Sequence, residues 1–267
     1  MQVDLPTTLD DALDVLAADP ETTVLAGGTD LMVAVNFRHI RPSHVVSLRR
    51  IDELREWEGD TIGAGVTYRR MERGPHRALA ELARTVGSPQ IRSAGTLGGN
   101  LGTSSPAGDT LPFLAALDAE IELASRARGR RRVPFEEFMV GPKRNSRASD
   151  ELIVAAVLPA EIPERQAFGK IGVRSAMVIA TVNACVMRSG DGTTRVALGA
   201  VGPVMIRPTR AEQLASEEAR PTAATLEEFS RLVSEAVQPI DDHRSTASYR
   251  RHASGILARR LLERCLR

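Results

Sequence analysis

The chain has 267 residues, 42% of them hydrophobic, and its 35 basic and 34 acidic side chains leave a formal net charge of +1. This balance disfavours nucleic acid or an anionic membrane surface as the main partner, and no apolar stretch approaches the roughly 20 residues that cross a bilayer. Two distant cysteines, Cys185 and Cys265, exclude a disulfide framework and a four-thiolate metal site within the chain, and an acidic N-terminus without an apolar run predicts a cytoplasmic protein.

The first 55 residues predict a small parallel sheet with helices. Apolar residues at helical spacing, a threonine cap and a terminating proline define the first helix, and two β-branched apolar runs define strands. The predicted elements are a helix at Leu9–Ala17, strands at Thr22–Ala26 and His44–Leu48, and a helix from Leu31 to Asn36 between the strands. A strand, a helix and a second strand in this order favour parallel pairing.

The middle of the chain combines strands with a glycine-rich segment. Glycines inside the apolar run at 61–67 predict a strand with close backbone approach. Residues 91–112 are rich in glycine and hydroxyl side chains, yet Leu97 and Leu101 punctuate them, which favours a folded loop over a linker. Other predicted elements are helices at 68–71, 77–86 and 110–117, strands at 119–124 and 151–158, and a basic turn at Arg126–Arg132.

A polar segment at 159–166, which contains Pro159 and Pro163, predicts a domain boundary near residue 160. Residues 1–160 form the first predicted domain, with subdomains at about 1–55 and 56–160, and residues 161–267 form the second. In the second, strands at 167–173, 179–187 and 194–201 precede helices at 208–215, 225–237 and 245–266. Strands covered by helices without a repeating βα order predict an α+β fold.

Two glycine-rich segments are the candidate binding elements. The first, Ala26-Gly27-Gly28-Thr29-Asp30-Leu31, lies between a strand and a helix, where glycines let backbone amides approach a phosphate. It matches neither a Rossmann nor a P-loop motif, and a tight turn capped by Asp or Thr is the alternative interpretation. The second, Thr96–Asp109, offers backbone donors, hydroxyls, an amide and a carboxylate, which suit a pyrophosphate and a ribose; a purely structural loop is its alternative. Two such segments together suggest a long, bent ligand such as an adenine dinucleotide.

These segments resemble a known family. AGGTDL at 26–31, TLGGNLGTSSPAGDTLP at 96–112 and DDHRSTASYRRHASGILARRLLE at 241–263 are similar to motifs of the FAD-binding subunit of molybdenum hydroxylases, relatives of xanthine dehydrogenase and carbon monoxide dehydrogenase. The resemblance covers nearly the whole chain. It implies an FAD-binding domain of the vanillyl-alcohol oxidase type, built from two subdomains, followed by a smaller α+β domain with an antiparallel sheet and helices.

The resemblance also implies roles for individual residues. Ala26 to Asp30 correspond to the pyrophosphate loop, Asp109 to a ribose ligand, and Lys170 to a lysine beside the flavin ring. Ile153 or Val154 corresponds to a residue beside the flavin or the adenine, and Arg174 is a weaker candidate. The remaining implied cofactor contacts are Leu31, Thr96, Gly98, Gly99, Asn100, Thr103 and Ser105. For Asp241, Arg244, Ser245 and Tyr249 a capped, ion-paired helix start is favoured over cofactor contact.

No motif predicts a catalytic acid, base or nucleophile, or a metal site, and a bound flavin would supply the redox chemistry. The family implies a subunit that takes electrons from a 2Fe-2S small subunit and passes them through FAD to NAD⁺, a quinone or oxygen. A molybdopterin-binding large subunit completes the implied heterotrimer or its dimer. Two alternatives stay open: a free-standing flavin oxidase or reductase, and a non-catalytic nucleotide-binding or assembly protein.

Overall fold

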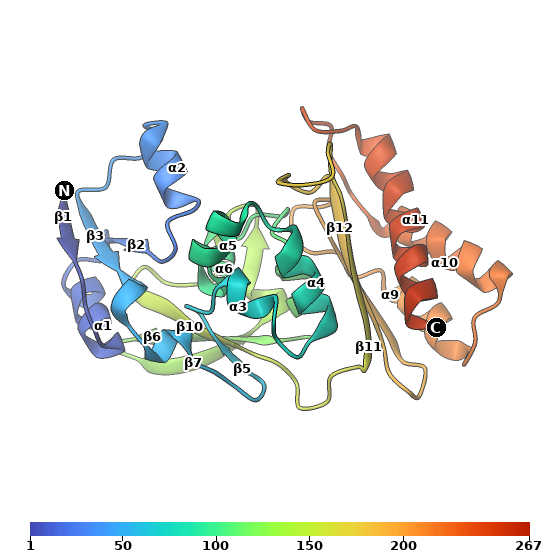
Figure 1. The fold of residues 1–267 in the computed structure, drawn as a ribbon, viewed down its shortest axis with the longest axis horizontal. Helices are drawn as coiled ribbons and strands as arrows, with labels where there is room; N and C mark the ends of the chain where they lie inside the picture. The colour runs from blue at the N-terminus through green and yellow to red at the C-terminus, as the bar shows by residue number, and fades with distance from the viewer.

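The computed structural model describes residues 1–267. The N-terminal end of the chain forms a three-stranded sheet (Figure 1). Its strands are β1 (Gln2–Asp4), β2 (Thr23–Leu25) and β3 (His44–Ser47). They pair in the order β1-β3-β2 and all in parallel, which confirms the predicted parallel sheet. Helix α1 (Leu9–Ala18) packs its apolar face into a small core beneath the strands, whereas α2 (Leu31–Asn36) buries none of its residues.

A five-stranded antiparallel sheet forms the middle of the molecule, with the order β4-β5-β10-β6-β7. Its strands are β4 (Trp57–Glu58), β5 (Thr61–Gly63), β6 (Glu120–Ser125), β7 (Gly129–Pro134) and β10 (Glu151–Val157). A Cβ on Gly63 would lie 2.4 Å from the Leu54 carbonyl oxygen, so the expected close backbone approach is present. The predicted basic turn is wrong in part, because Arg130, Arg131 and Arg132 extend along β7 and pair with acids on neighbouring strands.

Short helices cover this sheet, and one of them carries the candidate residues Gly98, Gly99, Asn100 and Thr103. These helices are α3 (Tyr68–Met71), α4 (Arg77–Thr85), α5 (Pro89–Ala94), α6 (Leu97–Thr103), α7 (Leu111–Ala116) and α8 (Phe135–Phe138). Smaller elements complete the region: the 3-10 helices η1 (Leu48–Arg50) and η2 (Glu53–Arg55) and the strand pair β8 (Met139–Gly141) and β9 (Arg144–Asn145). None of the helices of the chain combines the length and the apolar character that crossing a membrane requires.

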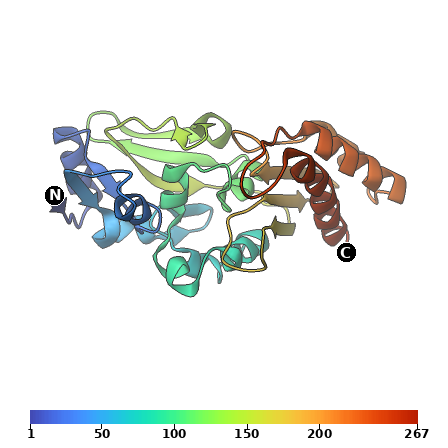
Figure 2. The ribbon, with the colours of Figure 1, turned by 90° about the horizontal axis from the view of Figure 1, so that it is seen from above.

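The C-terminal part is an antiparallel sheet backed by three helices, so the α+β prediction is confirmed. Strands β11 (Arg165–Ile171), β12 (Val182–Arg188) and β13 (Thr194–Gly199) pair in chain order. Helices α9 (Thr209–Glu217), α10 (Ala223–Ala236) and α11 (Ala247–Cys265) cover one face of the sheet. Seen from above, the three sheet regions follow one another along the long axis (Figure 2).

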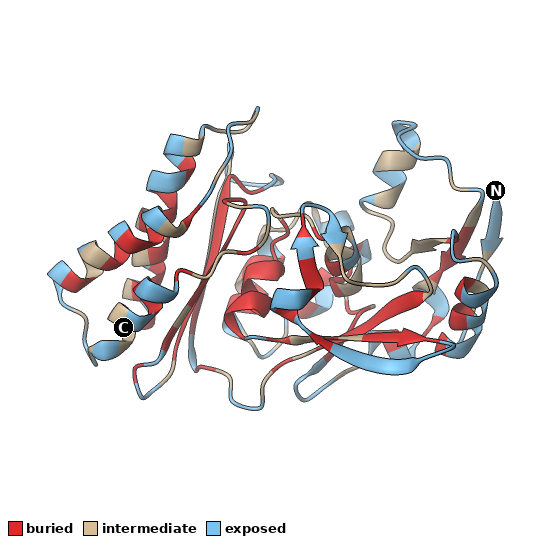
Figure 3. Ribbon diagram, turned by 180° about the vertical axis from the view of Figure 1, so that it is seen from behind, coloured by how far each residue is buried: buried red, intermediate tan, exposed pale blue.

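Side chains on the two faces of the C-terminal sheet belong to two different cores, one of which extends into the middle of the molecule. Phe168, Cys185 and Met187 belong to the large central core, whereas their neighbours Ala184 and Val186 belong to the core under α10 and α11. Successive residues of a strand point to opposite faces, so the sheet is buried on both sides. Figure 3 shows this as a red band through β12. The two cores therefore meet across one sheet.

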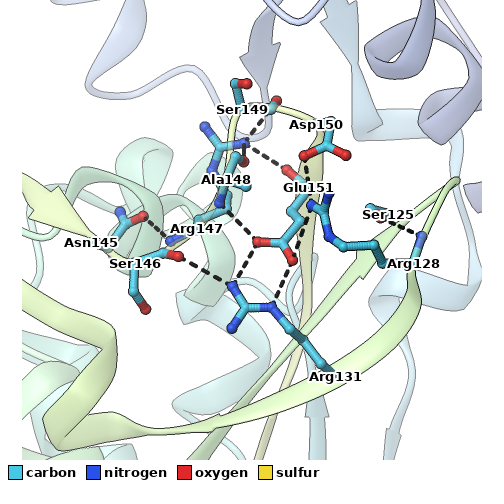
Figure 4. Close-up of polar contacts among 10 residues, drawn as sticks. All are labelled: Ser125, Arg128, Arg131, Asn145, Ser146, Arg147, Ala148, Ser149, Asp150 and Glu151. Carbon is cyan, nitrogen blue, oxygen red and sulfur yellow. Dashed lines mark hydrogen bonds and ion pairs between the residues drawn. The ribbon is translucent and has the colours of Figure 1, made fainter.

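A buried carboxylate anchors the start of β10 (Figure 4). The Glu151 side chain is 2% exposed and accepts hydrogen bonds from Arg131 Nε at 2.7 Å, Arg131 Nη2 at 2.9 Å and the Ala148 amide at 2.8 Å. The Arg131 hydrogen bond is the main reason that the pKa of Glu151 falls to about 2. This cluster holds the segment of Asn145, whose side-chain amide donates to the Gly102 carbonyl at the end of α6.

We expect Glu151→Gln to lower the free energy of unfolding by about 2 kcal/mol, because it weakens a charge-assisted pair whose carboxylate is buried and whose arginine is partly solvated. Urea unfolding measures the loss. The control, Glu120→Gln, removes a 3.6 Å pair with half-exposed Arg132 and should cost less than about 0.5 kcal/mol. Because the folded pKa of Glu151 is depressed, the difference between wild type and Glu151→Gln should be full above pH 4.5 and vanish toward pH 2. Equal losses in the two variants would contradict this account.

Candidate functional site

The first glycine segment is a bend with free backbone donors. Strand β2 ends at Leu25, Gly28 adopts a left-handed φ of +73°, and α2 begins at Leu31. None of the amide groups from Gly27 to Leu31 donates to an acceptor within the chain. Asp30 precedes the helix but makes no capping hydrogen bond, which disfavours the interpretation as a capped tight turn. Consecutive half-buried amides around a left-handed residue form a concave anion-binding arrangement.

The first half of the second glycine segment, Leu97–Thr103, is helix α6, so the prediction of a loop with a dense row of free donors is wrong for these residues. Thr96 caps α6 by accepting a hydrogen bond from the Gly99 amide at 3.0 Å. The Leu97 amide donates to the Val66 carbonyl at 3.0 Å and the Gly98 amide to the Ala64 carbonyl at 2.7 Å. The protein itself therefore provides acceptors for the first amides of this helix. Gly98 allows α6 to pack closely on Ala64, because a Cβ on Gly98 would lie only 2.6 Å from the Ala64 Cβ.

The structure brings the two glycine segments into contact although about 70 residues separate them in sequence. A Cβ on Gly27 would lie 1.9 Å from the Ala94 carbonyl oxygen, at the end of α5. The Thr103 hydroxyl at the other end of α6 lies 3.4 Å from an Asp30 carboxylate oxygen. The first segment therefore lies against a floor made by the ends of α5 and α6, as one ligand held by both segments requires.

Other predicted residues line or support this floor. Asn100 accepts a hydrogen bond from the Thr110 amide at 3.4 Å through Oδ1, while its side-chain nitrogen Nδ2 makes no hydrogen bond within the chain. Ser105 accepts from the Ala107 amide at 3.3 Å. Ile153 lies beneath α6, with its Cδ1 3.8 Å from where a Cβ on Gly102 would be. Because Ile153 is buried in the central core, it supports α6 from below.

A buried ion pair lies where α7 meets the C-terminal sheet. The Lys170 ammonium is 2.6 Å from Asp109 Oδ2, and the two side chains are 6% and 8% exposed. The Asn183 amide donates to Asp109 Oδ1 at 2.8 Å. Burial raises the pKa of Asp109, and Lys170 and Asn183 oppose that rise. Both oxygens of the carboxylate are thus bonded inside the protein, and the expected contact between Asp109 and a sugar stays a prediction.

Asn183 is a site residue that sequence analysis missed. It is fully buried on β12, directly opposite Lys170 on β11. Only the pairing register of β11 and β12 places Asn183 beside Lys170, and the sequence alone did not define that register. Had the register been known, an asparagine opposite the one lysine of the C-terminal sheet would have stood out.

A cationic hollow of about 760 Å³ adjoins Lys170. The end of α4, the start of α5 and the β11–β12 connection form its walls. Arg84, Arg92 and Arg174 line it together with Lys170, although the Arg174 guanidinium folds back onto the carbonyls of Ala176 and Met177. Lys170 pairs with Asp109 and Arg92 pairs with Glu72, so Arg84 and Arg174 are the uncompensated charges that favour an anionic group here.

The third motif is the start of α11, as the favoured interpretation predicted. Thr246 caps the helix by accepting from the Tyr249 amide at 3.3 Å. Asp242 accepts from Arg250 at 2.6 Å and from the Arg244 amide at 2.8 Å, and these bonds lower its pKa to about 2 against the opposing effect of burial. Asp242 is thus paired with Arg244 and Arg250 within the protein.

Comparison with known proteins gives consistent matches over the whole chain. Residues 1–161 match the model of the FAD binding domain in molybdopterin dehydrogenase, and residues 167–265 that of the CO dehydrogenase flavoprotein C-terminal domain. The chain is 31% identical to the putative xanthine dehydrogenase FAD-binding subunit XdhB of Escherichia coli K12, over 96% of this chain and 92% of that protein. It is also 31% identical to the nicotine 6-hydroxylase medium subunit of Paenarthrobacter nicotinovorans, over 96% and 94% of the two chains.

Solved structures agree. A chain of carbon monoxide dehydrogenase from Hydrogenophaga pseudoflava superposes with a TM-score of 0.91 at 28% identity, covering 99% of this chain and 96% of that one. A chain of quinoline 2-oxidoreductase from Pseudomonas putida 86 superposes with a TM-score of 0.91 at 27% identity, covering 100% and 96%. The fold of an FAD-binding domain followed by a C-terminal domain of antiparallel strands and helices is therefore shared with these proteins.

Proposed function

The chain belongs to the family of FAD-binding subunits of molybdopterin dehydrogenases, and on that premise we propose that it relays electrons from a 2Fe-2S partner subunit to an acceptor such as NAD⁺, a quinone or oxygen. FAD is the cofactor of this chain, whereas molybdopterin and iron–sulfur clusters belong to other subunits of such complexes. We further propose a cytoplasmic complex with a molybdopterin-binding large subunit and a 2Fe-2S small subunit, as a heterotrimer or its dimer.

The observation that carries the proposal is the row of free amides from Gly27 to Leu31. A pyrophosphate is an anion with several acceptor oxygens, and backbone amides can bind it without any lysine. The loop is half-buried apart from Asp30, and backbone donors in such positions normally have an acceptor. A ligand bound at the loop would supply the acceptors that the protein does not. The residues present therefore fit an FAD pyrophosphate.

The other candidate residues extend this site over α6 and toward the C-terminal sheet. We assign the loop residues Ala26, Gly27, Gly28, Thr29, Asp30 and Leu31 to the pyrophosphate and Thr96, Gly98, Gly99, Asn100, Thr103, Ser105 and Ile153 to the floor of the cofactor site. Lys170 is assigned to the flavin end, beside the cationic hollow. Because Asp109 bonds Lys170 and Asn183, we assign it the role of holding Lys170 in place.

Bound FAD supplies the redox chemistry, and the chain supplies binding and orientation. In this proposal the loop amides bind the pyrophosphate of the cofactor, and the residues of α6 contact the cofactor from below. The ion pair with Asp109 holds the Lys170 ammonium group at the flavin end. We also propose that residues 1–160 and 161–267 act as two domains, because the chain leaves the five-stranded sheet after Val157 and enters the three-stranded sheet at Arg165.

We expect the full chain, purified with its partner subunits, to hold about one FAD per polypeptide. Visible absorption and released-flavin fluorescence measure this content, and rapid reduction of the bound flavin by the substrate of the complex measures the relay. Absence of flavin would overturn the assignment and favour the nucleotide-binding or assembly alternative. Flavin turnover by the isolated chain on a substrate of its own would favour the free-standing oxidase or reductase.

A further inference from the structure

Helix α2 and the turn after it expose an apolar patch that nothing in the chain covers. We define the α2 patch as Met32, Val33, Phe37 and Ile40, whose exposed fractions are 44%, 51%, 70% and 39%. Helix α2 has six residues, five of them apolar, and buries none of them. In Figure 3 it is drawn without any buried residue. A helix this short is not stable by propensity alone, and helices of globular proteins are stabilised by packing an apolar face.

The C-terminal side of the α2 patch has a positive, unpaired rim, whereas the exposed Asp30 precedes the helix. From Leu31 to Arg50 the sequence has four arginines and no acidic residue, in a chain whose charges otherwise balance. Arg38 and Arg41, which flank Ile40, are exposed and make no ion pair, unlike the arginines of β7. A surface that docks here must bring an apolar hollow and its own carboxylates.

The position of the α2 patch relates it to the cofactor site. The free amides from Gly27 to Leu31 lead directly into α2, with no residue between the two. In Figures 1 and 3, α2, the β11–β12 connection and the turn before α11 project toward the same side of the molecule. The latter two segments also expose apolar side chains, namely Val173, Met177, Ile179 and Ile240. One partner could thus cover the cofactor site from α2 to the C-terminal sheet.

We propose that the α2 patch is the docking surface for the iron–sulfur partner subunit, through an apolar contact surrounded by carboxylates of that subunit. This inference rests on the proposed function, in which the iron–sulfur subunit delivers electrons to this chain and must therefore lie next to the cofactor site. The molybdopterin subunit has no such requirement. A second copy of this chain fits poorly, because Arg38 and Arg41 would face the same positive rim.

The test is the composition of the complex purified through a tag on this chain after co-expression with both partner subunits. We expect Phe37→Glu to lower the iron and labile sulfide per chain at least fivefold and to leave FAD per chain unchanged. Val140→Glu, a 53% exposed valine on β8, is the matched control and should change neither. Arg38→Glu with Arg41→Glu should lower iron retention and reduce its dependence on salt, because the variant removes the positive rim.

Three outcomes would overturn the proposal. Iron per chain could stay at the wild-type level in Phe37→Glu. Molybdenum could be lost while iron is retained, which would assign the α2 patch to the large subunit. The isolated chain could be a dimer that Phe37→Glu dissociates, with iron retention in the complex unchanged, which would assign the patch to a second copy. FAD per wild-type chain tests the proposed function separately, since iron per chain reports docking whether or not flavin is bound.

Discussion

Gly27→Ala is expected to abolish FAD retention and to lower the free energy of unfolding by about 2–4 kcal/mol. The added methyl group would lie 1.9 Å from the Ala94 carbonyl oxygen and 2.7 Å from its carbon. Both atoms belong to the backbone at the end of α5, so no side-chain rotation can relieve the overlap. The first glycine segment must then move away from α5 and α6, and its amides lose their position over the floor of the cofactor site.

The measurements are the FAD-to-chain ratio after gel filtration and the midpoint of urea unfolding. Because the amides lose their position at the cofactor site, FAD binding should weaken at least a hundredfold, which corresponds to about 2.8 kcal/mol of binding free energy. Gly190→Ala is the control, since its Cβ meets no atom within 4 Å and its φ is ordinary. Normal FAD content in Gly27→Ala would show that the contact between the two glycine segments is not part of the cofactor site.

A variant of the next glycine separates the effect of backbone strain from that of steric overlap with α5. Gly28 has a φ of +73°, and its Cβ would meet only the Leu25 and Met32 side chains at 3.3 and 3.4 Å. Gly28→Ala therefore forces a side chain into a left-handed conformation, at about 1–2 kcal/mol, without pushing the backbone segments apart. We expect its FAD loss to be smaller than that of Gly27→Ala.

The periodicity of apolar residues was enough to predict most of the fold. The C-terminal strands and helices were predicted to within a few residues, because each buries one or both faces in a core. The parallel β2–α2–β3 unit was predicted equally well, although α2 buries none of its residues. The first glycine segment was also located correctly, because a strand, paired glycines and a helix start in succession have few structural solutions.

Predictions failed where tertiary contacts override local preference. Glycines are poor helix formers, yet Thr96 caps α6 and the chain segment at Ala64–Val66 accepts its first amides. A run of arginines looked like a turn, yet cross-strand carboxylates such as Glu122 compensate it on β7. The acceptors of the α6 amides and the carboxylates beside β7 are distant in sequence, so they could not be identified before the fold was known.

The pair of Lys170 and Asp109 leads to the second large prediction. Asp109→Asn leaves the Lys170 ammonium buried without a counter-charge and should lower the free energy of unfolding by about 3–5 kcal/mol. Lys170→Met should cost less, because the remaining Asp109 carboxyl can take up a proton. Burial raises the pKa of Asp109, so this variant should gain stability as the pH falls from 7 toward 5.

The double variant Asp109→Asn/Lys170→Met decides whether the two side chains act as a unit. It removes both charges, so its loss should be well below the sum of the two single losses, with a coupling energy of about 2 kcal/mol or more. Urea unfolding of the four proteins at pH 7 gives this value. FAD content separates structure from site: if Asp109 serves only to hold Lys170, the double variant should bind FAD as Lys170→Met does. A further loss of FAD in the double variant would instead restore direct contact between Asp109 and the cofactor, and additive losses of stability would show that the pair is not coupled.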